Sequence, residues 1–377
     1  MPSPTSAQLA LGRARSDVDV ISRAGLPLHR FLDEATQAIE RALPMVGGCV
    51  ATLDPATAMV SNSWKFSTFA GRNEADVQWA QVEYGADDPT SFQTLIRTGT
   101  GAVGMHRATH GAVETSVRMA EVMLPCYDFH DEARTVLRDR HGAWGVIAVF
   151  RGAGDAPFEA QELAALAEMA PALTRGIRVG TLAQAGATRS DCPSGPAVMI
   201  VDGRDRLVQA SAGAATHLEQ LAMSPGAADP LSLVHALVTA ARRLARGEAD
   251  LPPRARVRTA EGIWLVLHAS PLGGAGDRAG DVVVTIEEAR PQEVIELVAD
   301  VFGLTARERD VTAHVLRGAD TKEIAAAMHV SPYTVQDHLK SIFDKAGVAS
   351  RRELVSRVYF DQYMPRRLEE GAGRLGA

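Results

Sequence analysis

The chain has 377 residues, of which 46% are hydrophobic, 23% are charged and only 5% are aromatic, and its net charge is −7. This length allows two or three domains, and no apolar run approaches the length of a membrane span, which argues against a membrane-spanning protein. The three cysteines, Cys49, Cys126 and Cys192, have no metal-type spacing, and their odd number fits a reducing compartment, so we expect a cytoplasmic protein.

The charge is unevenly distributed along the chain. Residues 303–360 carry nine Lys or Arg and seven Asp or Glu, a net charge of about +2, so the remainder carries about −9. We therefore expect a nucleic-acid surface only near the C-terminus, with the acidic remainder held away from DNA.

The N-terminal 180 residues are predicted to form a tail and a first domain. Residues 1–25 lack the basic start and apolar core of a signal peptide, and we expect a loose tail there. The first domain, 26–180, is predicted to contain a helix at 28–43, strands at 48–54 and 59–66, a hairpin at 134–140 and 145–151, and a long helix at 159–177. This order is typical of an α+β domain.

The second half of this first domain carries a family signal. The residues concerned are 136–139 (VLRD), 144–150 (WGVIAVF) and 158–162 (FEAQE). They resemble the second half of a GAF-type domain, and the resemblance implies a sensor role.

A second domain is predicted at 196–289, after a small, polar, Gly- and Pro-containing linker at 181–195. Strands are expected at 197–201, 207–210, 257–260, 263–270 and 281–287, with helices at 213–221 and 231–246. The segments 198–203 (VMIVDG), 207–210 (LVQA), 262–265 (GIWL) and 283–287 (VVTIE) are similar to a PAS-type domain. Ser211 stands where PAS domains often carry Asn, so the resemblance implies no specific ligand.

The C-terminal part shows the clearest helix signals. An amphipathic segment at 290–303 is predicted to be a connecting helix, and residues 361–377 a tail. Between them, residues 304–360 encode four short helices. One helix is predicted to begin at Ser331-Pro332, and helix ends are expected at Gly318 and Gly347. The other three open with capping-box pairs: Thr305 with Glu308, Asp320 with Glu323, and Ser350 with Glu353.

The two central helices of this segment predict DNA binding. The three residues His329-Val330-Ser331 leave room only for a tight turn between them, which is the geometry that sends a second helix into a major groove. The second helix has one apolar face, formed by Val335, Leu339, Ile342 and Phe343. Its other face carries groups able to read bases or hold phosphates, namely Tyr333, Thr334, Gln336, Asp337 and Lys340.

The whole pattern resembles the LuxR-type helix-turn-helix domain of bacterial transcription regulators. The matching residues are 305–309 (TARER), Gly318, 322–325 (KEIA), 330–331 (VS), 334–336 (TVQ), 338–339 (HL) and 345–348 (KAGV). The resemblance implies that bases are faced by Gln336, Asp337 and Lys340. It also implies that phosphates are held by Lys322, Thr334 and Tyr333, and that the fourth helix pairs with a second protomer through Leu354, Val355 and Val358. A carboxylate such as Asp337 repels phosphate unless it accepts a hydrogen bond from a cytosine N4.

A candidate ligand site lies in the first domain. Trp79, Tyr84, Asp88 and Pro89 form a pattern similar to the ligand-contacting stretch of acyl-homoserine-lactone sensors. Trp79 and Tyr84 would supply a flat apolar wall, and Asp88 would hold a polar group of the ligand. Trp64, Phe66, Phe69 and Phe92 are further candidates for the lining of a cavity. The alternative is a surface turn capped by Asp88, with the aromatic residues in ordinary core positions.

Other chemistries lack their signatures. His106 and His110, near Cys126 and His130, lack the spacing of a metal or haem site, and scattered surface histidines are the simpler explanation. The carboxylates that a phosphoacceptor receiver requires are missing, as are a P-loop, a nucleophile elbow, a zinc-binding HExxH and a dinucleotide fingerprint. We therefore expect no enzyme, no cofactor and no metal.

The predicted fold class is multidomain α+β, with GAF-like and PAS-like antiparallel-sheet sensor domains followed by an all-α, four-helix LuxR-type domain. The predicted function is sequence-specific transcription regulation by a homodimer that binds an inverted repeat of double-stranded DNA under the control of a small ligand or a partner at its sensor domains. RNA polymerase is a candidate partner. In the alternative, the sensor domains bind no small molecule and serve as protein-interaction or dimerisation platforms.

Overall fold

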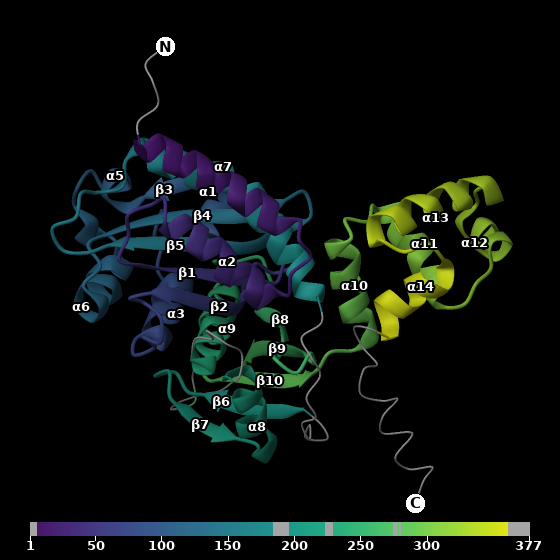
Figure 1. Ribbon diagram of the computed structural model, residues 1–377. Coiled ribbons are helices and arrows are strands. Elements are labelled where there is room, and N and C mark those ends of the chain that lie inside the picture. Colours follow the sequence, from purple (N-terminus) through teal and green to yellow (C-terminus); the bar gives the residue numbers. More distant parts are fainter. Residues whose placement is uncertain (1–5, 184–195, 223–228, 274–277, 279, 361–377) are drawn as a thin grey trace, which may run out of the picture. The chain divides into compact units, whose positions relative to one another are not determined.

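The computed structural model describes residues 6–183, 196–222, 229–273, 278 and 280–360, in two compact units, Met1–Glu288 and Ala289–Ala377 (Figure 1). The first unit holds two antiparallel sheets and the second is helical, so the predicted mixed α+β fold class is confirmed. The predicted linker from residue 184 onward and the predicted tail at 361–377 lie outside the described residues. Among the helices described, none has both the length and the apolarity that crossing a membrane requires.

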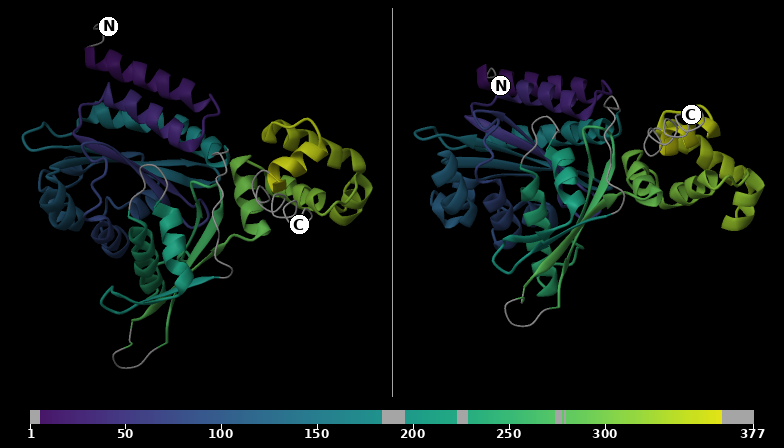
Figure 2. Two further views of the ribbon diagram at one scale, coloured as in Figure 1. Left: turned by 60° about the horizontal axis from the view of Figure 1, so that its bottom comes forward. Right: turned by 90° about the horizontal axis from the view of Figure 1, so that it is seen from below.

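Three helices form a layer over one face of the first sheet: α1 (Ser6–Ser22), α2 (Leu28–Glu40) and α7 (Ala160–Leu182) (Figures 1 and 2). The prediction of a loose tail at 1–25 is therefore wrong from Ser6 onward. Leu11, Ala14 and Val18 are buried, and their spacing of three and four residues places them on one side of a helix. Polar residues fill the positions between them, which is why the apolar stripe was too sparse to predict this helix.

The first sheet has the strand order β2-β1-β5-β4-β3, with all neighbours antiparallel. Its strands are β1 (Gly47–Leu53), β2 (Val60–Ser67), β3 (Ala102–Gly104), β4 (Asp131–Asp139) and β5 (Gly142–Arg151). The β4–β5 turn is shorter than the loop expected at 141–144. Gly142 adopts a φ of 137°, which favours glycine, and Trp144 is already a buried residue of β5.

The segment between β2 and β4 packs against the second face of this sheet. It contains α3 (Asp76–Gly85), α4 (Phe92–Thr98), α5 (Met105–Ala108), η1 (Val113–Thr115), the π-helical turn η2 (Met119–Met123) and α6 (Leu124–Tyr127). Most of its buried apolar side chains form one cluster with Ala51, Val146 and Ala148 of the sheet. The rings of Phe69, Tyr127, Phe129 and Phe150 contact one another, with centroids 4.4 to 5.7 Å apart.

The second sheet has the order β7-β6-β10-β9-β8, which repeats the connectivity of the first sheet. Its strands are β6 (Ala197–Val201), β7 (Leu207–Ala210), β8 (Arg254–Arg258), β9 (Trp264–Pro271) and β10 (Val282–Glu288), and α8 (Ala212–Ala222) and α9 (Pro230–Ala245) pack with them. β8 begins before the strand predicted at 257–260. Its buried Ala255 and Val257 alternate with three arginines, and these charges concealed the strand in the sequence.

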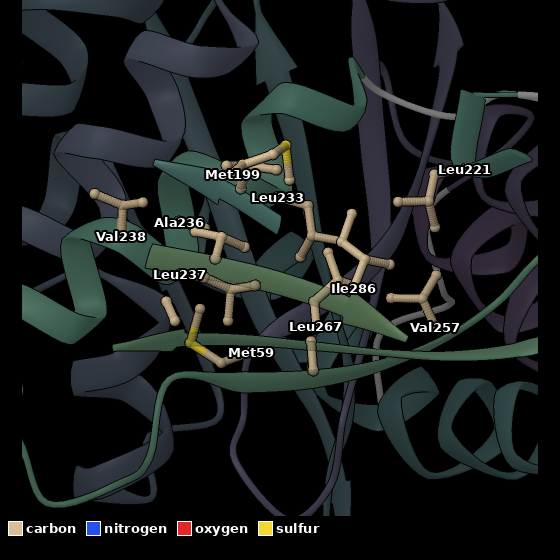
Figure 3. Packing of buried hydrophobic residues seen from close by; sticks show 14 of the residues in the cluster. Met59, Met199, Leu221, Leu233, Ala236, Leu237, Val238, Val257, Leu267 and Ile286 are labelled. Atoms are coloured by element: carbon tan, nitrogen blue, oxygen red, sulfur yellow. The ribbon is translucent and has the colours of Figure 1, made fainter. Parts of the chain in front are cut away.

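The two modules of this unit, residues 6–183 and 196–288, share one hydrophobic core. Met59, Ala80 and Tyr84 of the first module join the cluster built by α9 and the second sheet, and Figure 3 shows Met59 among these residues. A buried ion pair also crosses between the modules, since Arg256 Nε and Nη2 donate to the Asp54 carboxylate at 2.8 and 2.6 Å. The two expected sensor domains are therefore modules of a single compact unit.

The second unit is all-helical. It comprises α10 (Pro291–Val301), α11 (Ala306–Leu316), α12 (Thr321–Met328), α13 (Pro332–Ala346) and α14 (Arg351–Val355), which continues as the π-helical turn η4 (Ser356–Phe360). The expected connecting helix is present as α10 and belongs to this unit, where Asp300 pairs with Arg309 of α11. Two of the three predicted capping boxes are present. The third is only half formed, because Glu353 accepts from the N–H of Ala349 instead of that of Ser350.

Candidate DNA-binding surface and sensor cavity

The helix-turn-helix is fixed by caps at both of its helices. The Asp320 carboxylate accepts from the N–H groups of Lys322 and Glu323 at 2.7 and 2.8 Å and begins α12. His329, with a φ of 55°, ends α12 in the left-handed conformation. Ser331 Oγ then accepts from the Thr334 N–H at 3.1 Å and begins α13. Each of these caps joins residues that are close in the sequence, so the turn between the two helices is defined by local contacts.

The two faces of α13 differ in the way the sequence predicted. Val335, Leu339 and Ile342 are buried inside the unit. The exposed side chains include the three predicted base-contacting residues, Gln336, Asp337 and Lys340, together with Lys322 of α12 and Tyr333, which is 80% exposed. Thr334 is half-buried, and its hydroxyl hydrogen-bonds to Ser331 Oγ at 2.9 Å. Within this unit, the polar face of α13 is open to solvent.

Glu308 holds α11 and α13 together. Its carboxylate is buried, accepts hydrogen bonds from the Thr305 N–H at 2.6 Å and Ser341 Oγ at 2.7 Å, and forms an ion pair with Lys345 at 2.6 Å. Burial opposes ionisation of this group, but the hydrogen bonds from Lys345, Ser341 and Thr305 outweigh it and lower the pKa of Glu308 to about 2. The packing of α13 on the unit therefore depends on a charged carboxylate.

The predicted dimerisation residues are mostly inaccessible in the single chain. Leu354 is 0% exposed and Val358 is 2% exposed, because α14 and η4 pack these side chains inside their own unit. Only Val355 is partly exposed. A dimer contact through Leu354 and Val358 would require the unit to open, so their positions favour a structural role, and the exposed side of α14 is left for a partner.

The first unit contains a cavity of about 90 Å³ on the second face of the first sheet. Ala51, Val146 and Ala148 of β1 and β5 form its floor. Five aromatic side chains also line it: Phe69, Trp79, Phe92, Tyr127 and Phe150. The second module contributes Leu221, Leu233 and Val257. The cavity is therefore built from both modules and is largely apolar.

Four charged side chains that line this cavity are more than nine-tenths buried: Lys65, Asp76, Glu132 and Arg134. Lys65 pairs with Asp76, and Arg134 pairs with Glu132 at 3.2 Å. Arg134 also donates to Glu83 at 2.8 Å and stacks over the Phe92 ring at 3.5 Å from its centroid. Each of the four thus has a partner inside the protein.

The predicted ligand residues occupy different environments. Trp79 lines the cavity, as do the further candidates Phe69 and Phe92. Tyr84 lies in the shared core, where its hydroxyl accepts from the Val60 N–H at 3.0 Å. Asp88 accepts from Ser116 Oγ at 2.5 Å and pairs with buried Arg118 at 3.4 Å. Trp64 and Phe66 alternate along β2 with Ser63 and Lys65, so they point to the opposite face of the sheet and do not line the cavity.

Sequence reasoning missed the charged residues beside the cavity. Lys65 follows Ser61 and Ser63 at alternate positions of β2, and polar residues with this period usually indicate a solvent-facing side of a strand. Glu132 and Arg134 have the same spacing on β4. The available signal was the pair of opposite charges, Glu132 and Arg134, at alternate positions of β4, which is also what an exposed sheet would show.

The potential metal ligands noted in the sequence do not gather in the part of the chain that the structure describes. No group of three or more His, Cys, Asp or Glu side chains among those residues is placed to hold a metal ion. His130 instead lies 2.8 Å from the carboxylate of Asp128, at the surface.

Residues 303–358, which span α11 to α14, match the family described as bacterial regulatory proteins, luxR family. The C-terminal unit therefore contains a LuxR-type helix-turn-helix domain, as the resemblance implied. The monoamine regulon transcriptional regulator of Klebsiella aerogenes is 46% identical to this chain over 56 residues, which are 15% of this chain and 25% of that protein. The transcriptional regulatory protein UhpA of Escherichia coli is 41% identical over 56 residues, 15% of this chain and 29% of that protein. The chain thus spans about a quarter of the length of these curated relatives.

Among solved structures, the GAF domain from an Acinetobacter phosphoenolpyruvate-protein phosphotransferase resembles 46% of this chain and 94% of its own chain, at 14% identity and a TM-score of 0.29. A likeness this slight assigns neither a ligand nor an activity to this chain.

Proposed function

We propose that this protein is a sequence-specific transcription regulator that binds double-stranded DNA as a homodimer through the polar face of α13. The observation that carries the proposal is the exposure of Gln336, Asp337 and Lys340 on a capped helix of a LuxR-type domain. Exposed amide, carboxylate and ammonium groups on one helix face can bond to base edges in a major groove. Two such helices, one from each protomer, would enter an inverted repeat about one helical turn apart.

The phosphate-contacting role is proposed for Lys322, Tyr333 and Thr334. Lys322 and Tyr333 are exposed, at the start of α12 and in the first turn of α13. Because the Thr334 hydroxyl already bonds to Ser331, a phosphate contact by Thr334 would share that hydroxyl with the helix cap. For the homodimer, the exposed side of α14 beside Val355 is a better candidate surface than Leu354 and Val358, which are buried.

Gel-shift titrations test this function, with a DNA duplex from the region upstream of the protein's own gene compared with a duplex of scrambled sequence. Gln336→Ala and Lys340→Ala should each lose about 1–3 kcal/mol of discrimination between the two duplexes. Lys322→Ala should weaken binding to both duplexes alike. It should also reduce, by about one, the slope of log K for DNA binding against log salt concentration. Arg307→Ala, an exposed basic residue of α11, is the matched control. Unchanged selectivity in both α13 variants would remove the role assigned to this face.

The sensor unit is proposed to control DNA binding in response to a small molecule or a partner. The cavity favours a small molecule. The alternative, a protein-interaction platform, is favoured by β7, whose four residues are all exposed and include Leu207 and Val208 at 43% and 49%.

A further inference from the structure

We propose that the cavity of the sensor unit binds a small, uncharged, aromatic molecule that carries one hydrogen-bonding group and contacts both modules. Binding of this molecule to the cavity does not depend on the proposed function, because it requires no DNA. Only the further statement that the bound molecule is the effector of the regulator rests on the proposed function.

The shape and lining of the cavity select the size and apolar character of the ligand. A volume of about 90 Å³ suits a molecule with a single ring. The flat surfaces that line it are the side chains of Phe69, Trp79, Phe92, Tyr127 and Phe150, and aromatic rings pair favourably with a further ring in stacked or edge-on arrangements.

The electrostatics of the lining disfavour a charged ligand. Lys65 and Asp76 neutralise each other, and Arg134 is paired with Glu132 and Glu83. Asp229, the fifth charged residue of the lining, accepts a hydrogen bond from the Leu231 N–H at 2.9 Å and caps α9. Burial raises the pKa of the Cys49 thiol, which also lines the cavity, to about 12, so this group stays neutral at physiological pH. A carboxylate or ammonium would lose its hydration in the cavity and would have to displace an existing ion pair to find a partner.

The hydrogen-bonding group is assigned to Ser63. Its hydroxyl lines the cavity, is buried, and has no hydrogen-bond partner among the described residues. A buried hydroxyl without a partner is unfavourable, so a ligand hydroxyl, carbonyl or ring nitrogen placed there would satisfy it. Ser61, two residues earlier on the same strand, is already bonded to Thr52 Oγ1 at 2.8 Å.

The composite wall gives the ligand access to both modules. Leu233 of α9 and Val257 of β8 belong to the shared core, while the floor belongs to the first sheet. Val60 and Trp79 pack against both hydrophobic clusters of the unit. A ring held in the cavity would therefore contact side chains whose packing links one module to the other.

Calorimetric titration of the full chain with four probes tests the proposal: phenol, toluene, benzoate and benzylamine. Phenol is expected to bind best, with a Kd on the order of 0.1–1 mM, and the two charged probes at least tenfold more weakly. Ser63→Ala should weaken phenol about tenfold and leave toluene unchanged, since only phenol can bond to this hydroxyl.

A second pair of variants tests the contribution of the second module. Leu233→Trp should abolish binding of phenol and toluene by filling the cavity, whereas Leu207→Trp, on the exposed strand β7 of the same module, should leave it unchanged. The proposal is overturned if no probe binds the wild-type chain, if benzoate or benzylamine binds as tightly as phenol, or if Leu233→Trp binds like the wild type. Gel shifts with the same preparations separate the two claims, because probe binding without selective DNA binding contradicts the proposed function alone.

Discussion

Glu308 illustrates how one buried carboxylate supports the DNA-binding unit. Its partners Thr305, Ser341 and Lys345 come from the start of α11 and from the second half of α13, so the group fixes the position of α13 relative to α11. The residues that would contact DNA lie in the first nine positions of α13, before Ser341. Glu308 thus acts on the orientation of the polar face through packing, without touching it.

Glu308→Gln is expected to destabilise the C-terminal unit by about 1.5–3 kcal/mol at neutral pH, because a charge-assisted contact becomes a neutral one. The folded-state pKa is lowered, from the usual 4.5 to about 2, so the stabilisation is present above pH 4.5 and is lost as the pH falls toward 2. Urea unfolding of both proteins across this pH range measures the effect. Asp344→Asn, at an exposed position of α13, is the control. A constant difference between Glu308→Gln and the wild type down to pH 2 would contradict this account.

At the scale of the element, α13 is bounded by local signals at both ends. Ser331 and Pro332 begin it, and Gly347, with a φ of 64°, ends it in the left-handed conformation. These signals depend on a few neighbouring residues only, which is why the sequence predicted the helix and its polar face closely.

Gly347→Ala is expected to destabilise the C-terminal unit by about 1–2 kcal/mol, since an alanine at this φ is strained. Apart from the adjacent residues of the chain, no atom of the residues that the structure describes lies within 4 Å of the added Cβ, so the cost comes from backbone conformation. Gly12→Ala is the matched control, because Gly12 lies inside α1 with equally open surroundings, and there the change should stabilise by about 0.5–1 kcal/mol. Differential scanning calorimetry measures both changes, and shifts of the same sign would exclude a conformational cause.

For the whole molecule, the link between the two modules of the N-terminal unit is the main feature that the sequence did not predict. The type of most regular elements was predicted correctly from the sequence, since alternation and capping are local properties. It did not reveal that Asp54 and Arg256 meet, nor that Met59 enters the core of the second module, because those contacts join residues about 200 positions apart. The cavity depends on the same long-range packing, and of the candidate residues only Phe69, Trp79 and Phe92 line it.

Asp54→Ala is expected to destabilise the N-terminal unit by about 3–5 kcal/mol, because it leaves Arg256 buried without its charge partner. The double variant Asp54→Ala with Arg256→Met should recover part of this loss. Glu168→Gln, which removes the exposed ion pair with Arg15, should cost no more than about 1 kcal/mol. Chemical denaturation followed in the far ultraviolet compares the variants. Equal losses in Asp54→Ala and Glu168→Gln would mean that the buried pair has no special part in joining the modules.

The shared core also determines where the chain can be divided. A cut between the two sheets would strip Met59, Ala80 and Tyr84 of the apolar neighbours they have on α9 and the second sheet, and would leave Asp54 and Arg256 as solitary charges on freshly uncovered surfaces. Fragments made in that way should expose apolar surface and should aggregate. Cutting the chain between Glu288 and Ala289 keeps every one of these neighbours on the same piece, which makes this the natural boundary for producing the N-terminal unit on its own.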